Sequence, residues 1–296
     1  MGANLKEVRL RMASVKSTTQ ITKAMKMVSA AKLRKATDRI VQIRPYANQL
    51  NSVLQNLAAN LGDEMNSSFA NQRAIQKALI VVITSDKGLC GGFNANAVKS
   101  TKALLNDKYA DLAAKGKVDL LTIGKKGYDA FKSSKLKVNN DFGNLFSHLS
   151  FEDASKAAEY IMIAFEQKEY DVVEVVYGQF KNAGTQVPTT EQFLPIQTST
   201  AAAGATKAKS DYMFEPSQEK ILNDLVPKIL KTQFFRYLLD SNASEHGARM
   251  TAMDKATENA NELLKSLNIM YNRARQAAIT TELTEIVSGA AALSNG

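Results

Sequence analysis

The chain has 296 residues, 45% of them hydrophobic, and a net charge of +9 at pH 7, as expected for a folded protein of one large or two ordinary domains. Its longest apolar run, residues 78–83, is far shorter than the roughly 18 residues that a membrane-spanning helix needs. Cys90 is the only cysteine, which excludes an intrachain disulfide and a cysteine-based metal cluster. The N-terminus is charged from Lys6 onward, so we expect no secretory signal or transit peptide and a reducing compartment.

Residues 1–62 are predicted to form one long helix. Pro45 is expected to kink it and Gly62 to end it. Apolar residues recur mainly at steps of three and four, which is typical of a helix that packs along its length against a partner helix. The proposed seam consists of Leu5, Val8, Met12, Val15, Ile21, Met25, Val28, Ile40, Ile43, Ala47, Leu50, Leu54, Leu57 and Leu61.

The positive charge is concentrated in this helix. Residues 1–44 contain eleven basic and two acidic residues, so they account for the whole net charge of +9. Such a helix is typical of a protein that binds nucleic acid, anionic lipid or an acidic protein surface, although a solvated helix face is an alternative. Nucleic acid is disfavoured because the first aromatic residue is Tyr46 and no base-reading motif is present.

Residues 63–210 have the pattern of an α/β domain. Buried strands are predicted at residues 78–84, 118–123 and 171–180, with helices near 94–114 and 152–167 between them. Strands that alternate with helices predict a Rossmann-like, mostly parallel sheet covered on both faces. Residues 199–210 are small and polar, as in a linker.

The glycine-containing segment 85–94 follows the first of these strands, where α/β folds hold phosphate groups. It matches neither the P-loop nor the dinucleotide-binding pattern, so a tight structural turn is the favoured interpretation. A thiol nucleophile at Cys90 with His148 or His246 as base is disfavoured, because His246 is expected to lie far from the sheet. We therefore expect no catalytic residue, no cofactor and no metal site.

Residues 211–296 are predicted to form a second long helix. Pro216 suits a first turn, and Pro227 and Gly247 are candidate bends. Its seam repeats at alternating steps of three and four through Met250, Met253, Thr257, Ala260, Leu264, Leu267, Tyr271, Ala274 and Ala278. The simplest arrangement is an antiparallel coiled coil of the N- and C-terminal helices with the α/β domain inserted between them.

Several segments closely resemble the gamma subunits of F-type rotary ATP synthases. They are residues 245–260 and 271–293 near the C-terminus, residues 21–36 near the N-terminus, and the segment 85–94. Because these blocks lie at both ends and in the middle, the resemblance covers essentially the whole chain.

The resemblance implies a non-catalytic central rotor stalk that couples ion-driven rotation of the c ring to ATP synthesis or hydrolysis at the beta subunits. The implied partners are three alpha and three beta subunits, the epsilon subunit and the c ring. No nucleic acid and no direct membrane contact are implied. The implied location is the cytoplasmic face of a bacterial plasma membrane, and the matrix side of the mitochondrial inner membrane is the less favoured alternative. A coiled-coil protein that binds nucleic acid through the basic helix is the alternative.

The resemblance also assigns individual residues to partners. Contacts with an acidic catch loop of a beta subunit are implied for Arg275 and Gln276, with Arg249 and Thr280 as supporting positions. Contacts with the lower, moving part of a beta subunit are implied for Met25 and Lys26. Contacts of the foot, the part of the subunit that carries the α/β domain, with the c ring are implied for Tyr212 and Glu215. Phe214 stands where tyrosine is common in the family, and the cysteine pair of chloroplast gamma subunits is absent.

Overall fold

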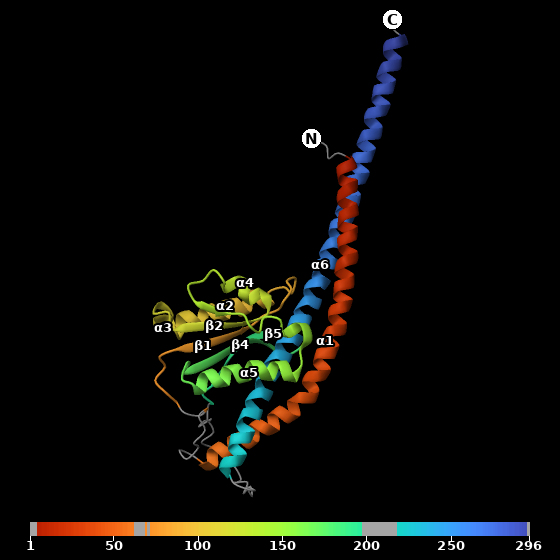
Figure 1. The fold of residues 1–296 in the computed structure, drawn as a ribbon. Helices are drawn as coiled ribbons and strands as arrows, with labels where there is room; N and C mark the ends of the chain where they lie inside the picture. The colour runs from red at the N-terminus through yellow and green to blue at the C-terminus, as the bar shows by residue number, and fades with distance from the viewer. Residues whose placement is uncertain (1–4, 62–68, 70–71, 197–217, 295–296) are drawn as a thin grey trace, which may run out of the picture. The chain divides into compact units, whose positions relative to one another are not determined.

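Both ends of the chain form long helices, as predicted. The computed structural model describes residues 5–61, 69, 72–196 and 218–294. The helices α1 (Leu5–Leu61) and α6 (Gln218–Ser294) continue without a break through Pro45 and Pro227. The chain forms two compact units, residues 29–249 and residues 1–28 with 250–296, so each long helix contributes to both (Figure 1). No helix among the described residues is both long enough and apolar enough to cross a membrane.

The unit of residues 29–249 contains a five-stranded sheet in the order β3-β2-β1-β4-β5. The first four of these strands are parallel, and β5 joins the edge antiparallel to β4. The prediction of a mostly parallel sheet is confirmed, although β3 and β5 had no expected counterpart. The strands are β1 (Ala78–Ile83), β2 (Val118–Ile123), β3 (Lys137–Asn139), β4 (Val172–Phe180) and β5 (Gln186–Leu194).

The helical segments between the strands also lie close to their predicted positions. The single helix expected over residues 94–114 is divided, because Tyr109 leaves the helical conformation and its hydroxyl donates a hydrogen bond of 2.9 Å to buried Glu174. Ser150 caps the helix over 151–166 by accepting the backbone N–H of Asp153 at 3.1 Å. The elements are α2 (Phe93–Asp107), α3 (Ala110–Ala114), α4 (Lys125–Phe131), the 3-10 helix η2 (Leu145–His148) and α5 (Phe151–Glu166).

Helices cover both faces of the sheet (Figure 1). On β1, Leu79 and Val81 share a core with buried residues of α5 and α6, whereas Ile80 and Val82 share another with residues of α2 and α4. Side chains of successive strand residues point to opposite faces, so a strand buried on both faces must be apolar throughout. This explains the continuous apolar run of β1 and gives a three-layer, Rossmann-like arrangement.

The surroundings of α6 change abruptly at residue 249. Between Tyr237 and Arg249 every residue except Asn242 is buried. From residue 250 onward, in the other unit, the fully buried residues are Met253, Thr257, Ala260 and Leu267. All four belong to the predicted seam, and the remaining seam residues are half-buried, so the seam of α6 is confirmed.

Candidate functional site

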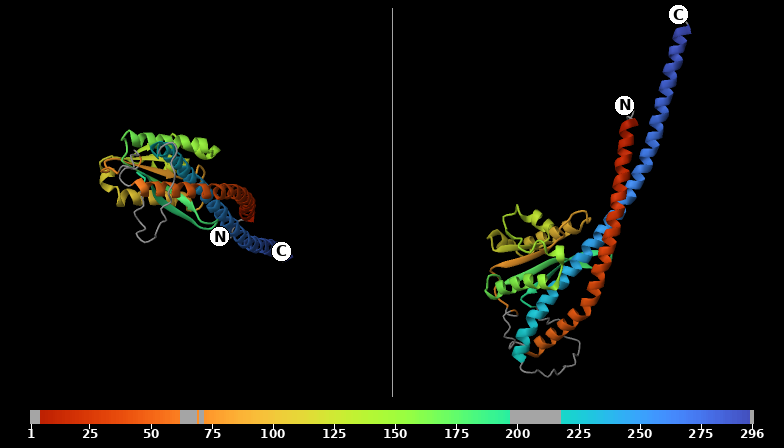
Figure 2. Two further views of the ribbon diagram at one scale, coloured as in Figure 1. Left: turned by 90° about the horizontal axis from the view of Figure 1, so that it is seen from below. Right: turned by 45° about the vertical axis from the view of Figure 1, so that its right-hand side comes forward.

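In the unit of residues 1–28 and 250–296, the two helices form an antiparallel coil (Figure 1 and Figure 2). Arg9 donates to the Tyr271 hydroxyl at 2.9 Å, and the Thr22 and Thr257 hydroxyls are joined at 2.7 Å. Lys26 and Asp254 form an ion pair of 2.5 Å. The residue numbers of each pair add up to 279 or 280, so one register holds along this unit.

The end of α6 extends past the described part of α1. In this register Leu5, the first described residue of α1, lies opposite residue 275, so residues 276–294 have no described residue opposite them. Their large apolar side chains are exposed, from 48% for Ile279 to 87% for Leu293. Exposed apolar surface on an isolated helix marks a site of interaction with another molecule.

The polar residues assigned to the beta catch lie at the start of this extension. Arg275, Gln276 and Thr280 are all exposed. Gln276 and Thr280 are four residues apart and therefore share one side of α6, and the Thr280 hydroxyl donates to the Gln276 carbonyl at 2.9 Å. The guanidinium of Arg275 is a planar donor suited to a carboxylate partner. This group can bind an acidic segment, and its contacts with a beta subunit stay a prediction.

The other predicted coil residues, Met25 and Lys26, lie on α1 near Asp254, a position of α6 about six turns before Arg275. Lys26 is 42% exposed in its pair with Asp254, and Met25 is half-buried. An ion pair this exposed stabilises by only about 0–1 kcal/mol, so the Lys26 ammonium remains accessible to a stronger acidic partner.

The seam predicted for α1 is wrong at two of its positions, Ile21 and Val28. Ile21 and Val28 are each 57% exposed, whereas Thr19 and Thr22 are buried. Val15 to Ile21 is a step of six, whereas the threonines continue the steps of four and three from Val15. Their hydroxyls can be buried because they donate to carbonyls one helical turn earlier, at 3.0 Å and 3.1 Å. The displaced apolar residues form an exposed surface on the outside of the coil.

Arg249, the fourth predicted catch residue, is buried in the unit of residues 29–249. Its guanidinium pairs with Glu245 at 2.5 Å and donates to the backbone carbonyls of Lys87 and Gly88 at 2.9 Å and 3.3 Å. Burial raises the pKa of Glu245 although Arg249 opposes the shift. Burial, with Arg249 and Lys32, lowers the pKa of His246 to about 4. The structure thus gives Arg249 an internal role, and its contact with a beta subunit is untested.

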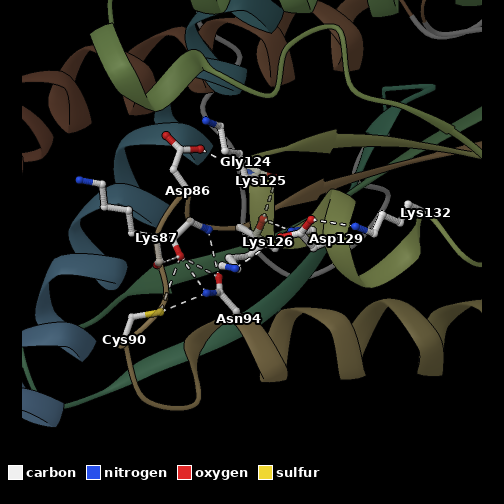
Figure 3. Close-up of polar contacts among 12 residues, drawn as sticks. Asp86, Lys87, Cys90, Asn94, Gly124, Lys125, Lys126, Asp129 and Lys132 are labelled. Carbon is white, nitrogen blue, oxygen red and sulfur yellow. Dashed lines mark hydrogen bonds and ion pairs between the residues drawn. The ribbon is translucent and has the colours of Figure 1, made fainter.

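The segment 85–94 is a self-contained turn rather than an open phosphate cradle. Asn94 accepts from the Ser85 backbone N–H at 3.0 Å and donates to the Ser85 hydroxyl at 2.8 Å. It also donates to the Cys90 sulfur at 3.2 Å (Figure 3). Leu89 and Gly91 adopt positive φ values of 63° and 57°. These contacts favour the interpretation as a tight turn.

Side chains of this chain enter the crevice in which open α/β sheets usually bind ligands. The strand order reverses between β1 and β4, which places this crevice at their carboxyl ends. A Cβ added at Gly178 would lie only 2.6 Å from Phe93. Ser244 of α6 donates to the Gly178 carbonyl at 2.9 Å. Phe93 and Ser244 therefore occupy the space beside Gly178.

The structure also bears on the thiol hypothesis. His246 was expected to lie far from the sheet, and this expectation is wrong, because the neighbouring Arg249 binds the turn after β1. Cys90 is nevertheless buried, and its polar neighbours are Asn94 and Ser85. Within the described ranges, no three His, Cys, Asp or Glu residues are grouped so that they could hold a metal ion. Tyr212, Phe214 and Glu215 lie outside the described residues.

Comparison with known proteins gives matches along nearly the whole chain. A family model described as ATP synthase matches residues 4–293. The ATP synthase gamma chain of Cytophaga hutchinsonii is 57% identical over 293 residues and that of Flavobacterium johnsoniae 51% over 291 residues. The alignments cover 99% and 98% of this chain, respectively, and 99% of each relative.

Solved structures agree with these matches. A chain from the structure of the central stalk and c ring of the Tetrahymena thermophila mitochondrial ATP synthase is 29% identical, with a TM-score of 0.57 over 80% of this chain and 99% of the other. A chain of the Euglena gracilis mitochondrial ATP synthase has a TM-score of 0.66 over 98% of this chain and 94% of the other. At 20% identity, the second likeness concerns the fold alone.

Proposed function

This chain belongs to the gamma-chain family of ATP synthase, the subunit of the central rotor stalk, and on this premise we propose how its surfaces engage the rest of the enzyme. The coil of residues 1–28 and 250–296 turns inside a ring of three alpha and three beta subunits. ATP is made or hydrolysed on the beta subunits, and this chain transmits torque to them.

The observation that carries this proposal is the end of α6 that extends past the described part of α1. Residues 276–294 expose a series of apolar side chains without a described helix opposite them. A helix with such a surface is marginal in water and requires surrounding protein. A smooth apolar sleeve formed by the subunit ring would cover it and still allow it to turn.

Torque requires contacts that differ among the three beta subunits. A rotor can change a nucleotide site only if it binds the open and closed states of a beta subunit with different free energies. The polar group formed by Arg275, Gln276 and Thr280 provides directional contacts for an acidic catch loop. Met25 and Lys26 lie lower on the coil and face the moving part of a beta subunit.

The test is the double substitution of Arg275→Ala with Gln276→Ala. We expect assembly to be retained and the rate of ATP synthesis in membrane vesicles to fall. Lys265→Ala is the matched control, because it removes an exposed cation from the same helix about 15 Å away. An unchanged synthesis rate in the double variant, or an equal loss in the control, would contradict the proposed catch.

The remaining partners are assigned to the unit that contains the sheet. We place the c ring and the epsilon subunit against this foot, with Tyr212 and Glu215 toward the c ring. This arrangement makes the chain a peripheral subunit on the cytoplasmic face of a bacterial membrane, held there by the c ring. The nucleic-acid-binding alternative gains no support from any of the similar proteins.

A further inference from the structure

The buried part of α6 in the unit of residues 29–249 carries an unusual number of polar side chains. Residues 237–249 read YLLDSNASEHGAR and are buried except for Asn242. A helix buried on all sides is expected to be apolar, and each buried polar group needs a partner to offset the loss of water. The partners of these groups therefore indicate what the polar residues do.

Five residues of α6 bind five different elements of this unit, and we call these contacts the polar ties. Lys231 pairs with Glu159 of α5 at 2.5 Å, and Arg236 pairs with Glu191 of β5 at 3.3 Å. Asp240 pairs with Arg44 of α1 at 3.2 Å, and Arg44 also donates to the Phe180 carbonyl of β4 at 3.2 Å. The remaining ties are Ser244 to the Gly178 carbonyl of β4 at 2.9 Å and Arg249 to the Lys87 carbonyl at 2.9 Å.

The ties are arranged around the helix. Arg236, Asp240 and Ser244 are four residues apart and share one side of α6. Lys231 and Arg249 lie five residues beyond each end of this series, and a step of five residues turns by about 140°. The helix is therefore held from more than one side, and it cannot roll or slide without breaking the ties.

Apolar packing alone would resist such movement less well. Burial of apolar surface has no preferred direction, so one apolar contact can replace another as a helix slips. A hydrogen bond is directional, and the buried donors of Ser244 and Arg249 find no water in exchange if they leave their acceptors. Polar ties fix the rotational position of α6 relative to the sheet, which a shaft under load needs.

We propose that the polar ties are the torque joint of the rotor, the positioning residues that lock the α/β domain to α6 when load passes between them. This inference rests on the proposed rotor function and adds the place at which the foot is fastened to the shaft. It predicts that loosening the ties lets the loaded foot slip on α6 while the coil still drives unloaded catalysis.

The test uses the assembled complex with a bead attached through a cysteine introduced at exposed Ser133, since Cys90 is buried. The joint variant combines Glu191→Gln with Asp240→Asn, which keep the shape of both side chains and remove the charge. We expect unchanged unloaded ATP hydrolysis and a lower stall torque measured at the bead.

The matched control is Glu174→Gln. Glu174 is 3% exposed, close to the 4% of Asp240, and lies on β4 in the same sheet. Its partners are Lys108 and Tyr109, on the α2 and α3 side, and it makes no tie to α6. Thermal unfolding of both variants measures the loss of stability that each substitution causes. The control should keep its stall torque at an equal or greater loss of stability.

Full stall torque in the joint variant, or an equal loss of torque in the control, would overturn the inference. If the joint variant does not assemble, Lys231→Met removes a tie whose partner, Glu159, is 47% exposed and can be solvated by water. That variant should also slip under load, and full stall torque would again refute the joint. A wild-type bead that does not rotate with ATP would instead contradict the proposed rotor function itself.

Discussion

His246 should stay uncharged far below the pH at which an ordinary histidine takes up a proton. It is 9% exposed, and burial lowers its pKa from 6.5 to about 4. Arg249 and Lys32 add to the shift because both are positively charged. Protonation would place a third positive charge beside those of Arg249 and Lys32, and burial favours the protonated, uncharged form of Glu245.

The sign of the effect on stability follows from proton binding. Between pH 6.5 and about 4 the unfolded chain holds a proton on His246 that the folded chain does not. The stability that His246 contributes to the folded chain is therefore fully present above the pKa of the unfolded chain and is lost as the pH falls toward the pKa of the folded chain. A difference of about 2.5 pKa units corresponds to about 3 kcal/mol in all, of which about 2 kcal/mol is lost between about pH 7 and pH 5.

The perturbation is His246→Gln, which cannot take up the proton. Its free energy of unfolding, measured by urea denaturation, should fall less on acidification than that of the unaltered chain, by about 2 kcal/mol between about pH 7 and pH 5. The raised pKa of Glu245 works in the opposite direction in the acidic range, but it is present in both proteins and largely cancels in the comparison.

A direct measurement can be made on the assembled enzyme. Exchange of the histidine C2 proton, followed by mass spectrometry, reports the pKa of each histidine separately. The chain has two histidines, and His148 is exposed, so it provides the internal control. A His246 midpoint at an ordinary histidine pKa, or the same loss of stability in His246→Gln, would refute this reasoning.

Three further predictions concern the core, the coil and the thiol. Gly124 has φ of 94°, and a Cβ there would lie 2.2 Å from the Thr84 carbonyl oxygen. Gly124→Ala should therefore lower the free energy of unfolding, measured in urea, by roughly 3 kcal/mol. Gly88→Ala is the control and should not, because a Cβ at Gly88 would meet nothing within 4 Å. Thr22→Val and Thr257→Val should each cost about 1 kcal/mol and together less than their sum, a coupling that a double-mutant cycle measures; strict additivity would contradict the shared hydrogen bond. Dithiol reduction should not alter ATP hydrolysis through buried Cys90, and a reductant response abolished by Cys90→Ser would show otherwise.

The sequence alone was sufficient wherever one period described a whole element. The seam from Met250 onward repeats at steps of three and four, and the structure buries its residues accordingly. The apolar runs of β1 and β2 identified the strands buried on both faces. β5 was not predicted because an edge strand is less buried than a central one, and this strand contains Pro188 and several polar residues. β3 is only three residues long.

Tertiary structure decided which polar residues are buried. Thr19 and Thr22 lie inside the coil although Ile21 beside them is apolar, because helical spacing outweighs the hydrophobicity of a single residue. A strict reading of the spacing would have found them. No spacing pattern in the sequence predicts the contacts of Arg249. Its partners are backbone carbonyls more than 160 residues earlier, and only folding brings the turn after β1 against α6. Sequence periodicity reports the neighbours along one helix, whereas contacts between distant segments depend on how the whole chain packs.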